Sequence, residues 1–363
     1  MQSNNNLIKN GVNPSLLFHK SHEDLLSVKN TTFYLGIDPT SSSLHIGHLI
    51  PLKLAMELID AGWKCIILIG GFTGAIGDPT DKKALRSPID SQTIKRNISS
   101  LKKQLKKIFQ HRKVLMVNNA TWMNRMALKS YLEIGLQISV NQKVSLDTFA
   151  NRLNNSLPLS MTEFIYSDLQ ALDFLHLYNK YKCRVQIGGQ DQWGNISQGL
   201  HMVQKITKEK QIYGITTPLL TNNGVKMGKT EKPMNLFQDP FDIYDYLYRQ
   251  GPEFRQQLSK YFSCTTDNLF DTLMQIIGVN QNIIHRIKQH NWRNAYRTSE
   301  TKLSNILFYF KYVGSTTEAK EKIKDGALLI DGVKVQENQS LLRGKTYKVQ
   351  YSNFMPRYVK IVS

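Results

Sequence analysis

The sequence predicts an α/β fold in which a doubly wound parallel sheet is followed by a helical domain and a small α+β domain. Three observations predict it. Short apolar runs alternate with a helical pattern between residues 33 and 80. The later chain is helical and aromatic-rich through roughly Trp292. Residues 303–363 combine one short helix with strands separated by Asp-Gly turns.

The parallel sheet is predicted from three continuous apolar runs, at residues 33–37, 64–69 and 184–187. Such runs are typical of strands that are buried on both faces of a sheet. Between the first two runs, residues 49–61 have the apolar spacing of a helix, which Gly62 ends. Strand, helix and strand in this order make the βαβ unit of a Rossmann-like nucleotide-binding domain.

A basic amphipathic helix is predicted over residues 94–113. Apolar residues recur there at steps of four and three, and the opposite face is basic with no acid in it. Its basic residues are Lys95, Arg96, Lys102, Lys103, Lys106, Lys107, Arg112 and Lys113. A solvated surface helix and an RNA contact both fit this pattern, and the sequence leaves both open.

The composition favours a partner rich in negative charge. Lys and Arg number 47 against 28 Asp and Glu, a net charge of +19. RNA or DNA is the usual polyanion, although a general abundance of Lys, Asn and Ile would produce the same excess. No run reaches the ~18 apolar residues of a membrane span, so no membrane partner is expected.

The cysteines predict a reducing compartment. Cys65, Cys183 and Cys264 are isolated, and their spacing fits neither a disulfide framework nor metal ligands. The first residues lack an apolar leader core and an Arg-rich amphipathic stretch. We therefore expect the cytoplasm of a bacterium, with a mitochondrion or plastid as the alternative.

Residues 39–48 predict a nucleotide site. A short loop leads from the first strand into a helix, so free amides at the helix N-terminus point to whatever binds above the sheet. Gly47 lets a nucleotide base approach the backbone, and His45 is placed to hydrogen-bond phosphates as charge develops. Metal ligation and simple helix capping are the alternatives for His45 and His48.

Residues 160–173 predict the floor of a polar pocket. Ser160 and Glu163 have the spacing of a capping box, so a helix is expected to begin there. Tyr166, Gln170 and Asp173 then share one face of that helix among apolar neighbours. A stripe facing solvent is the alternative, but it does not require a phenol, an amide and a carboxylate together.

Two loops complete the candidate site. The glycine-rich run at residues 70–78 ends at Asp78, whose carboxylate suits an ammonium group or a ribose hydroxyl. The loop at residues 226–230 carries two lysines and a hydroxyl, which can close over phosphates and open again. Each loop alone is weak evidence, so their value depends on the other motifs.

Taken together, these motifs resemble a known family. His-Ile-Gly-His at residues 45–48 and Lys-Met-Gly-Lys-Thr at residues 226–230 resemble the two signatures of class I aminoacyl-tRNA synthetases, and Asp78 with residues 188–195 looks like the tyrosyl branch of bacterial type. The resemblance implies that ATP with Mg²⁺ activates L-tyrosine to tyrosyl-adenylate, releasing pyrophosphate, and that tyrosine then passes to the 3′ terminal adenosine of tRNA-Tyr. It also implies a homodimer and no protein-bound metal or prosthetic group.

The resemblance assigns roles to residues of this chain. Those implied in catalysis are Thr40, His45, His48, Lys226, Lys229 and Thr230. Those implied in tyrosine binding are Tyr34, Asp78, Tyr166, Gln170, Asp173 and Gln192. Those implied in ATP binding are Gly36, Asp38, His45, Gly47, His48, Asp191 and Lys229. Tyr34 and Asp173 are implied to bind the substrate phenol, and phenylalanine would leave these buried groups unpaired.

The resemblance also implies three domains. Residues 1–225 form the catalytic domain, with an inserted connective and dimerisation segment at about 114–160. Residues 226–300 hold the second signature and a helical anticodon-stem domain, and residues 303–363 form a small basic RNA-binding domain of the ribosomal-protein type. Two rival interpretations are a tryptophanyl synthetase and a non-catalytic RNA-binding paralogue. Tyr34 and Asp173 argue against the first of these.

Overall fold

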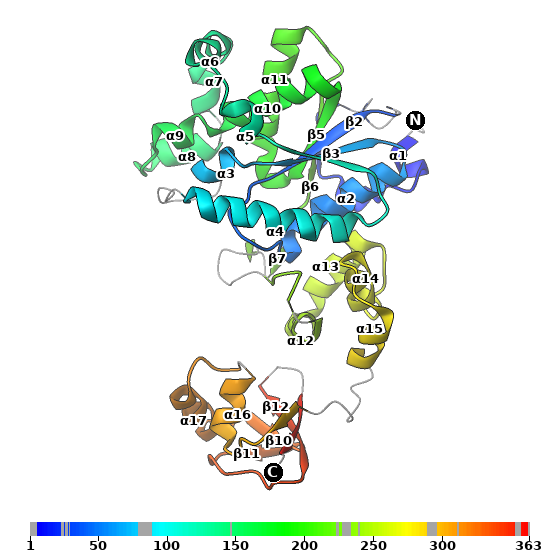
Figure 1. Cartoon of the computed structure of the whole chain (residues 1–363), viewed down its shortest axis with the longest axis vertical. Coiled ribbons are helices and arrows are strands. Elements are labelled where there is room, and N and C mark those ends of the chain that lie inside the picture. The colour runs from blue at the N-terminus through cyan, green and yellow to red at the C-terminus, as the bar shows by residue number, and fades with distance from the viewer. Residues whose placement is uncertain are drawn as a thin grey trace. The chain divides into compact units, whose positions relative to one another are not determined.

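The computed structural model describes residues 6–22, 25, 28, 30–78, 89–145, 147–222, 225–226, 234–238, 240–288, 296–310, 312–352 and 357–361. The chain forms two compact units that interleave in sequence (Figure 1). One holds residues 1–237, 256–269 and 276–278, and the other holds residues 238–255, 270–275 and 279–363. The predicted division into three functional domains stays a prediction, because these units are defined by compactness and not by role.

A six-stranded sheet forms the centre of the first unit, in the order β1-β6-β5-β2-β3-β4. Its strands are β1 (His19–Lys20), β2 (Thr32–Ile37), β3 (Lys64–Ile69), β4 (Val114–Asn118), β5 (Cys183–Gly189) and β6 (Tyr213–Thr217). Neighbouring strands are parallel except at the edge, where β1 pairs antiparallel with β6. The three predicted strands correspond to β2, β3 and β5, so the predicted parallel sheet is confirmed.

Helices cover both faces of this sheet (Figure 1). On one face α10 (Tyr166–Tyr181) and α11 (Trp193–Thr207) pack together and contact β5. The ring of Tyr34 lies in an apolar cluster with Phe174 of α10 and Ile196 of α11. Because side chains alternate across a strand, Phe33 faces the other side. The helix α2 (Leu49–Asp60), which contacts β2, β3, β5 and β6, corresponds to the helix predicted over residues 49–61.

The strand order creates a crevice between β2 and β5. From β2 the chain builds outward to β3 and β4, whereas β5 and β6 extend the sheet on the other side of β2. Ligands of doubly wound sheets bind where the order reverses, beyond the carboxyl ends of the strands. The segments that follow β2, β3 and β5 are those that the sequence marked as the candidate site.

Two helices near the crevice differ in detail from the sequence prediction. The basic helix is α4 (Ser91–Phe109), and it ends before residue 113 because Gln110 adopts a φ of +48°. The capping box of Ser160 and Glu163 is present and begins α9 (Met161–Phe164). A break at Ile165 separates α9 from α10, so the polar stripe lies on a second helix.

Between β4 and α9, the described residues form four short helices: α5 (Ala120–Met123), α6 (Leu128–Gly135), α7 (Val140–Val144) and α8 (Asp147–Asn154). A buried ion pair holds this segment to α10, because Lys143 Nζ lies 2.6 Å from Asp168 Oδ2. On and just after α6, by contrast, Leu128, Leu132 and Leu136 are 71%, 58% and 82% exposed.

The remaining helices and strands are shorter or belong to the second unit. The first unit also contains α1 (Asn6–Lys9), α3 (Thr73–Ile76) and the strand pair β7 (Thr221–Asn222) and β8 (Val225–Lys226). The second contains α12 (Pro240–Arg249) and α15 (Gln281–Lys288), while α13 (Pro252–Phe262) and α14 (Leu269–Ile276) contribute residues to both. Within the described ranges, no helix combines the length and apolar character needed to cross a membrane.

The end of the chain has its own sheet and core. The sheet has the order β11-β10-β12-β13-β9, and its strands are β9 (Tyr296–Thr298), β10 (Leu328–Ile330), β11 (Val333–Val335), β12 (Thr346–Tyr351) and β13 (Arg357–Ile361). Apolar residues of α16 (Leu303–Tyr309) and α17 (Thr316–Lys324) form one cluster with this sheet. The hairpin signal is confirmed, because Asp331 and Gly332 take φ values of +52° and +85° in a two-residue turn between β10 and β11.

Candidate active site

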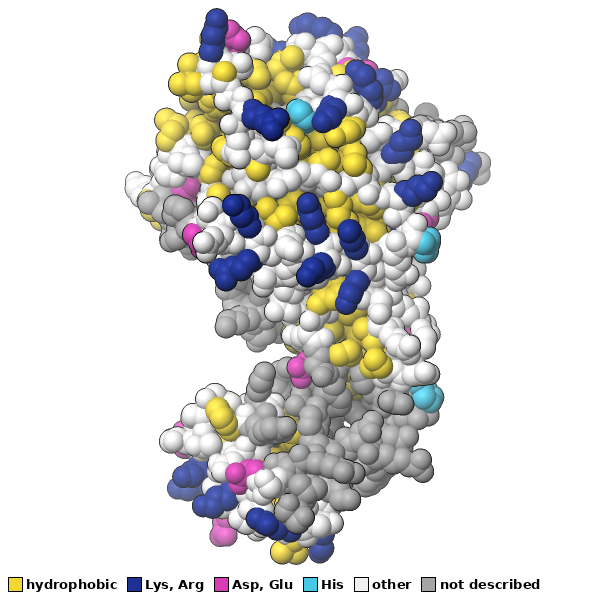
Figure 2. Space-filling model, in the orientation of Figure 1, with side chains coloured by type: hydrophobic (Ala, Val, Ile, Leu, Met, Phe, Trp, Pro, Cys, Tyr) yellow, Lys and Arg dark blue, Asp and Glu magenta, His cyan; other side chains and the backbone are white. Residues whose placement is uncertain are grey.

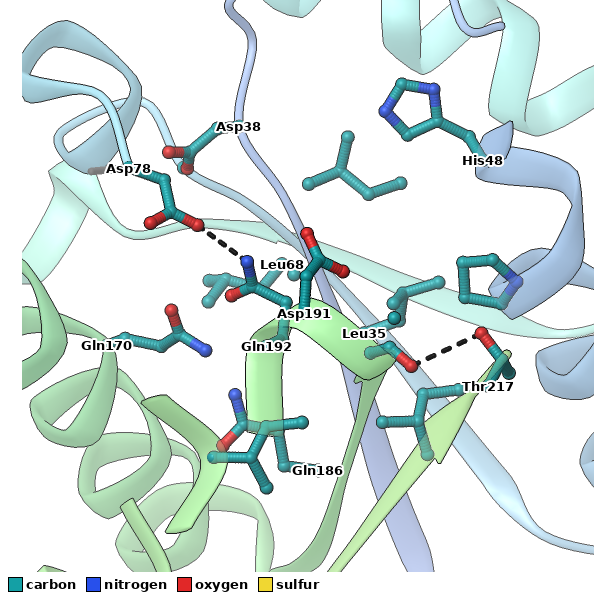
Figure 3. A pocket seen from close by; sticks show the side chains of 18 of the residues that line it. Leu35, Asp38, His48, Leu68, Asp78, Gln170, Gln186, Asp191, Gln192 and Thr217 are labelled. Carbon is teal, nitrogen blue, oxygen red and sulfur yellow. Dashed lines mark hydrogen bonds between the residues drawn. The ribbon is translucent and has the colours of Figure 1, made fainter. Parts of the chain in front are cut away.

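A cavity of about 340 Å³ lies at the carboxyl ends of β2, β5 and β6 (Figure 3). It is lined by thirteen of the predicted site residues: Tyr34, Gly36, Asp38, Thr40, His45, Gly47, His48, Asp78, Tyr166, Gln170, Asp173, Asp191 and Gln192. The other three belong to the second signature. Lys226 lies in β8, but its side chain, and all of Lys229 and Thr230, lie outside the described residues. The structure therefore brings together every predicted site residue whose side chain it describes.

The deepest part of the cavity holds a buried carboxylate and a buried phenol. Asp173 Oδ2 accepts a hydrogen bond from Asn119 Nδ2 at 2.9 Å, and Oδ1 accepts one from Trp122 Nε1 at 2.8 Å. The Trp122 ring is stacked on His176, with centroids 4.2 Å apart. The hydroxyl of Tyr34 is buried and has no hydrogen-bond partner among the described residues. Such an atom suits a ligand that brings its own polar group.

Burial has a measurable consequence for Asp173. It raises the pKa of this carboxyl from 3.8 to about 8, against the two hydrogen bonds that lower it. A raised folded-state pKa means that the folded protein binds the proton more tightly than the unfolded chain does. The proton held by Asp173 therefore adds its full amount to the free energy of unfolding below pH 4, and this amount is lost as the pH rises toward 8.

We expect the free energy of unfolding to fall between pH 5 and pH 8 more steeply in the wild type than in Asp173→Asn, which has no proton to lose at this position. Urea unfolding of both proteins at these two pH values measures the difference. Equal pH dependence in the two proteins would contradict the raised pKa.

Two further acidic side chains, Asp38 and Asp78, line the cavity. Asp38 Oδ2 accepts from Tyr166 Oη at 2.7 Å, and Asp38 Oδ1 accepts from Thr73 Oγ1 at 2.8 Å. Asp78 Oδ2 accepts from Gln192 Nε2 at 2.6 Å, as Figure 3 shows. Burial, followed by the charges of Asp38 and Asp78, raises the pKa of Tyr166, so this phenol stays protonated. Carboxylates gathered in this way favour a cationic group on the ligand.

His48 lies across the cavity from Gln170 (Figure 3), and His45 also lines the cavity. His45 Nδ1 accepts from the Gly47 amide, and His48 Nδ1 accepts from the His45 amide, both at 3.1 Å. Both rings therefore carry their proton on Nε2. Burial and the nearby His45 lower the pKa of His48 to about 3, so its ring is neutral near pH 7. The two histidines thus cap the helix at the edge of the cavity that they line.

The loop that carries these histidines is held by α4. Asn97 Nδ2 donates to the Pro39 carbonyl at 2.9 Å. Gln104 Nε2 donates to the Ser42 carbonyl at 2.8 Å, and Gln104 Oε1 accepts from the Leu44 amide at 2.9 Å. The buried side of α4 thus fixes the loop that leads to His45 at the rim of the cavity.

The chain that follows the second signature is anchored beside the first. The Leu236 amide donates to the Leu44 carbonyl at 2.9 Å, and the Ile46 amide donates to the Met234 carbonyl at 3.0 Å. Met234 comes only four residues after the end of the second signature, so this pairing joins the segment that contains His45 to the part of the chain just beyond residue 230. The two paired segments lie far apart in the sequence, so no local sequence pattern predicts this backbone pairing.

The residues that support the carboxylates were not predicted from the sequence. Asn119 and Trp122 follow β4, and the polar pair at residues 118–119 directly after an apolar run was the available signal. Asn119 Nδ2 also donates to Thr73 Oγ1 at 3.0 Å, which links Asp173 to Asp38. A Cβ on Gly70 would overlap the Asp38 carboxylate and the Thr73 hydroxyl, so a larger residue there would displace these hydrogen-bonded side chains.

The alternative of a metal site gains no support from the geometry. Across the residues with described placement, no group of three or more His, Cys, Asp or Glu side chains could hold a metal ion. The absence of a resident metal stays a prediction.

Comparison with known proteins identifies one family. A family model described as class I tRNA synthetases (W and Y), for tryptophan and tyrosine, matches residues 27–308. A C-terminally truncated mitochondrial tyrosyl-tRNA synthetase from Aspergillus nidulans is 28% identical with a TM-score of 0.62, over 78% of this chain and 86% of that one. The corresponding Coccidioides posadasii enzyme is 28% identical with a TM-score of 0.59, over 78% and 84%. Plasmodium falciparum tryptophanyl-tRNA synthetase, at 14% identity and a TM-score of 0.53 over 78% and 84%, shares the fold alone.

Proposed function

The chain belongs to the class I tRNA synthetases of the tryptophan and tyrosine family, which use ATP as a substrate, and we propose that it is a tyrosine–tRNA ligase. The proposed reaction joins L-tyrosine to ATP as tyrosyl-adenylate and then transfers tyrosine to the 3′ terminal adenosine of tRNA-Tyr.

The observation that carries the proposal is the pair of buried groups at the deep end of the cavity. The Tyr34 hydroxyl has no hydrogen-bond partner among the described residues, and Asp173 is held in place by two donors. A substrate phenol can donate to Asp173 and accept from Tyr34 at once. The indole of tryptophan can only donate, and phenylalanine can do neither, so each would leave a buried polar group unpaired.

The other groups fit the remaining parts of the reactants. Asp78 and Tyr166, with Gln170, are proposed to bind the substrate ammonium group, and Asp191 the ribose of ATP. The tyrosine carboxylate attacks the α-phosphate, an oxygen–phosphorus bond forms, and pyrophosphate leaves with the Mg²⁺ that entered with ATP. We propose that the Nε2–H groups of His45 and His48 donate to phosphate oxygens as charge develops, and that the lysines of residues 226–230 close over the pyrophosphate.

Charging of RNA tests the complete reaction. We expect the purified protein to attach labelled tyrosine to a tRNA-Tyr transcript, and to leave phenylalanine and tryptophan unattached. A protein that binds the transcript but charges it with none of the three would instead be the non-catalytic RNA-binding paralogue.

Replacing Tyr34 with phenylalanine separates function from stability. Removal of a buried, unpaired hydroxyl should leave the free energy of unfolding unchanged or raise it by up to about 1 kcal/mol. The preference for tyrosine over phenylalanine in adenylate formation should fall about tenfold, the worth of one hydrogen bond. Urea unfolding and ATP–pyrophosphate exchange measure the two effects. A variant that is less stable and equally selective would remove Tyr34 from the proposed phenol site.

A homodimer is proposed to form through the apolar side of α6. Leu128, Leu132 and Leu136 are exposed at steps of one helical turn, as expected of a covered face. Aspartate at both Leu132 and Leu136 should reduce the mass in light scattering to that of one chain, 41.7 kDa. Leu342→Asp, at a residue that is 61% exposed in the terminal sheet domain, is the matched control and should leave the mass unchanged. Identical masses for all three proteins would contradict this interface.

The proposed partners and location follow from the family. Residues 226–300 and 303–363 are proposed to bind the anticodon stem and other parts of tRNA-Tyr. The two fungal mitochondrial enzymes, at 28% identity, support the mitochondrial alternative over the bacterial cytoplasm.

A further inference from the structure

The outer face of α4 has a charge pattern that the chemistry of the cavity does not explain. Besides Arg112, seven cations lie on α4 or within four residues of its end: Lys95, Arg96, Lys102, Lys103, Lys106, Lys107 and Lys113. Within the described ranges, none of them forms a salt bridge, whereas the neighbouring Arg112 is bound through two nitrogens by Asp60 at 2.7 and 2.8 Å. Figure 2 shows the resulting row of basic side chains across this face of the first unit.

The spacing of the cations suits a phosphate backbone. Lys95, Lys103 and Lys106 are exposed, and they lie at steps of eight and three residues on one side of α4. With a rise of about 1.5 Å per residue, this places positive charge on nearly every turn over roughly 17 Å. RNA duplexes present a similarly regular row of negative charge, and neutralising it releases counterions.

General enrichment in lysine does not account for the pattern. The whole chain carries 28 acidic residues against 47 basic ones, yet residues 91–113 contain no acidic residue at all. The buried side of the same helix carries the amides Asn97 and Gln104, which hold the phosphate-facing loop of the cavity. The basic face is therefore attached to the rim at which ATP and the RNA terminus must meet.

We propose that the outer face of α4 is a docking surface for the acceptor arm of the substrate tRNA, contacting its phosphates. This inference rests on the proposed function for the identity of the RNA. The contacts are electrostatic and independent of sequence, so they orient the duplex while other residues select the tRNA. Their position beside the rim means that binding there brings the duplex to the edge of the reaction site.

The test uses the full-length protein and an RNA minihelix that consists of only the acceptor and T arms of tRNA-Tyr. One variant replaces Lys95, Lys103 and Lys106 by glutamine. The matched control replaces Lys9, Lys64 and Lys180, three exposed lysines outside α4, in the same way. Binding is measured over a range of salt concentrations, and ATP–pyrophosphate exchange, which needs no RNA, is measured on the same preparations.

We expect the α4 variant to bind the minihelix about 10- to 100-fold more weakly than the wild type does. The slope of log K against log salt concentration should fall by the equivalent of about two to three phosphate contacts. The control should bind as the wild type does. Pyrophosphate exchange should stay within about twofold of the wild type in both, because neither set touches the cavity. The proposal is overturned if the minihelix binds the α4 variant normally, or if both variants weaken it equally. It is also overturned if only a long structured RNA without an acceptor arm loses affinity, since α4 would then serve another RNA. Absence of pyrophosphate exchange in the wild type would refute the proposed function, and minihelix binding would still test the surface.

Discussion

Replacing Asp173 with alanine is expected to lower kcat/KM for tyrosine in adenylate formation by about 10³-fold or more, and to abolish the preference for tyrosine over phenylalanine. The carboxylate lies at the deep end of the cavity, and Asn119 and Trp122 aim it by donating to both of its oxygens. Without it the substrate phenol loses its acceptor, and two buried donors of the protein lose theirs. ATP–pyrophosphate exchange with each amino acid measures the ratio.

The same helix offers a matched control. Asp168 is also a buried carboxylate of α10, but it is bonded to Lys143 and Gln198 and does not line the cavity. Asp168→Asn should lower stability, because it weakens a buried ion pair, and leave the selectivity ratio unchanged. If Asp173→Ala kept the wild-type ratio, or if Asp168→Asn lost it to the same degree, the assignment of the phenol site would be wrong.

Replacing His45 with alanine is expected to lower kcat for adenylate formation by about 10²- to 10³-fold and to change the KM for ATP little. The lost group is a neutral Nε2–H that is proposed to donate to phosphate as charge develops. His45→Gln, whose amide nitrogen can donate from a similar position, should recover part of the rate. Rapid-quench measurement of adenylate formation gives kcat and KM separately.

The environment of the second histidine constrains the pH profile. Because the pKa of His48 is lowered to about 3, its ring does not change charge between pH 5 and pH 8. We therefore expect no contribution from His48 to the pH dependence of the rate in this range.

A His45→Ala variant with an unchanged kcat and a raised KM would assign His45 to ground-state binding alone.

Much of the fold could be predicted because it depends on short, local sequence patterns. The apolar runs that became β2, β3 and β5 are continuous, and each is followed by glycine or proline within a few residues. The capping box of Ser160 and Glu163 has a fixed spacing, and the Asp-Gly turn at residues 331–332 requires two positive φ values. Such features depend on a few neighbouring residues, so they survive without knowledge of the tertiary structure.

The unpredicted parts depend on contacts between distant residues. Asn119 and Trp122 gain their importance only when β4 pairs with β3 and brings its end beside α10. The edge strand β1 has only two residues, and it exists because His19 and Lys20 pair with β6. The break between α9 and α10 at Ile165 interrupts a sequence with continuous helical spacing. The grouping of Tyr166, Gln170 and Asp173 was nevertheless predicted, because helical spacing alone places them on one face.

The support between the carboxylates could not be predicted either. Thr73 accepts from Asn119 and donates to Asp38, so a single hydroxyl joins the deep end of the cavity to its mouth. The three residues come from the ends of three different strands, and no spacing in the sequence connects them.

The measurement that tests the central claim most directly is ATP–pyrophosphate exchange by the purified protein, with tyrosine, phenylalanine and tryptophan compared side by side. The account predicts exchange with tyrosine alone, because only a phenol satisfies both Tyr34 and Asp173. Exchange with tryptophan in place of tyrosine would contradict the proposed specificity within the family, and exchange with none of the three would contradict the enzyme itself.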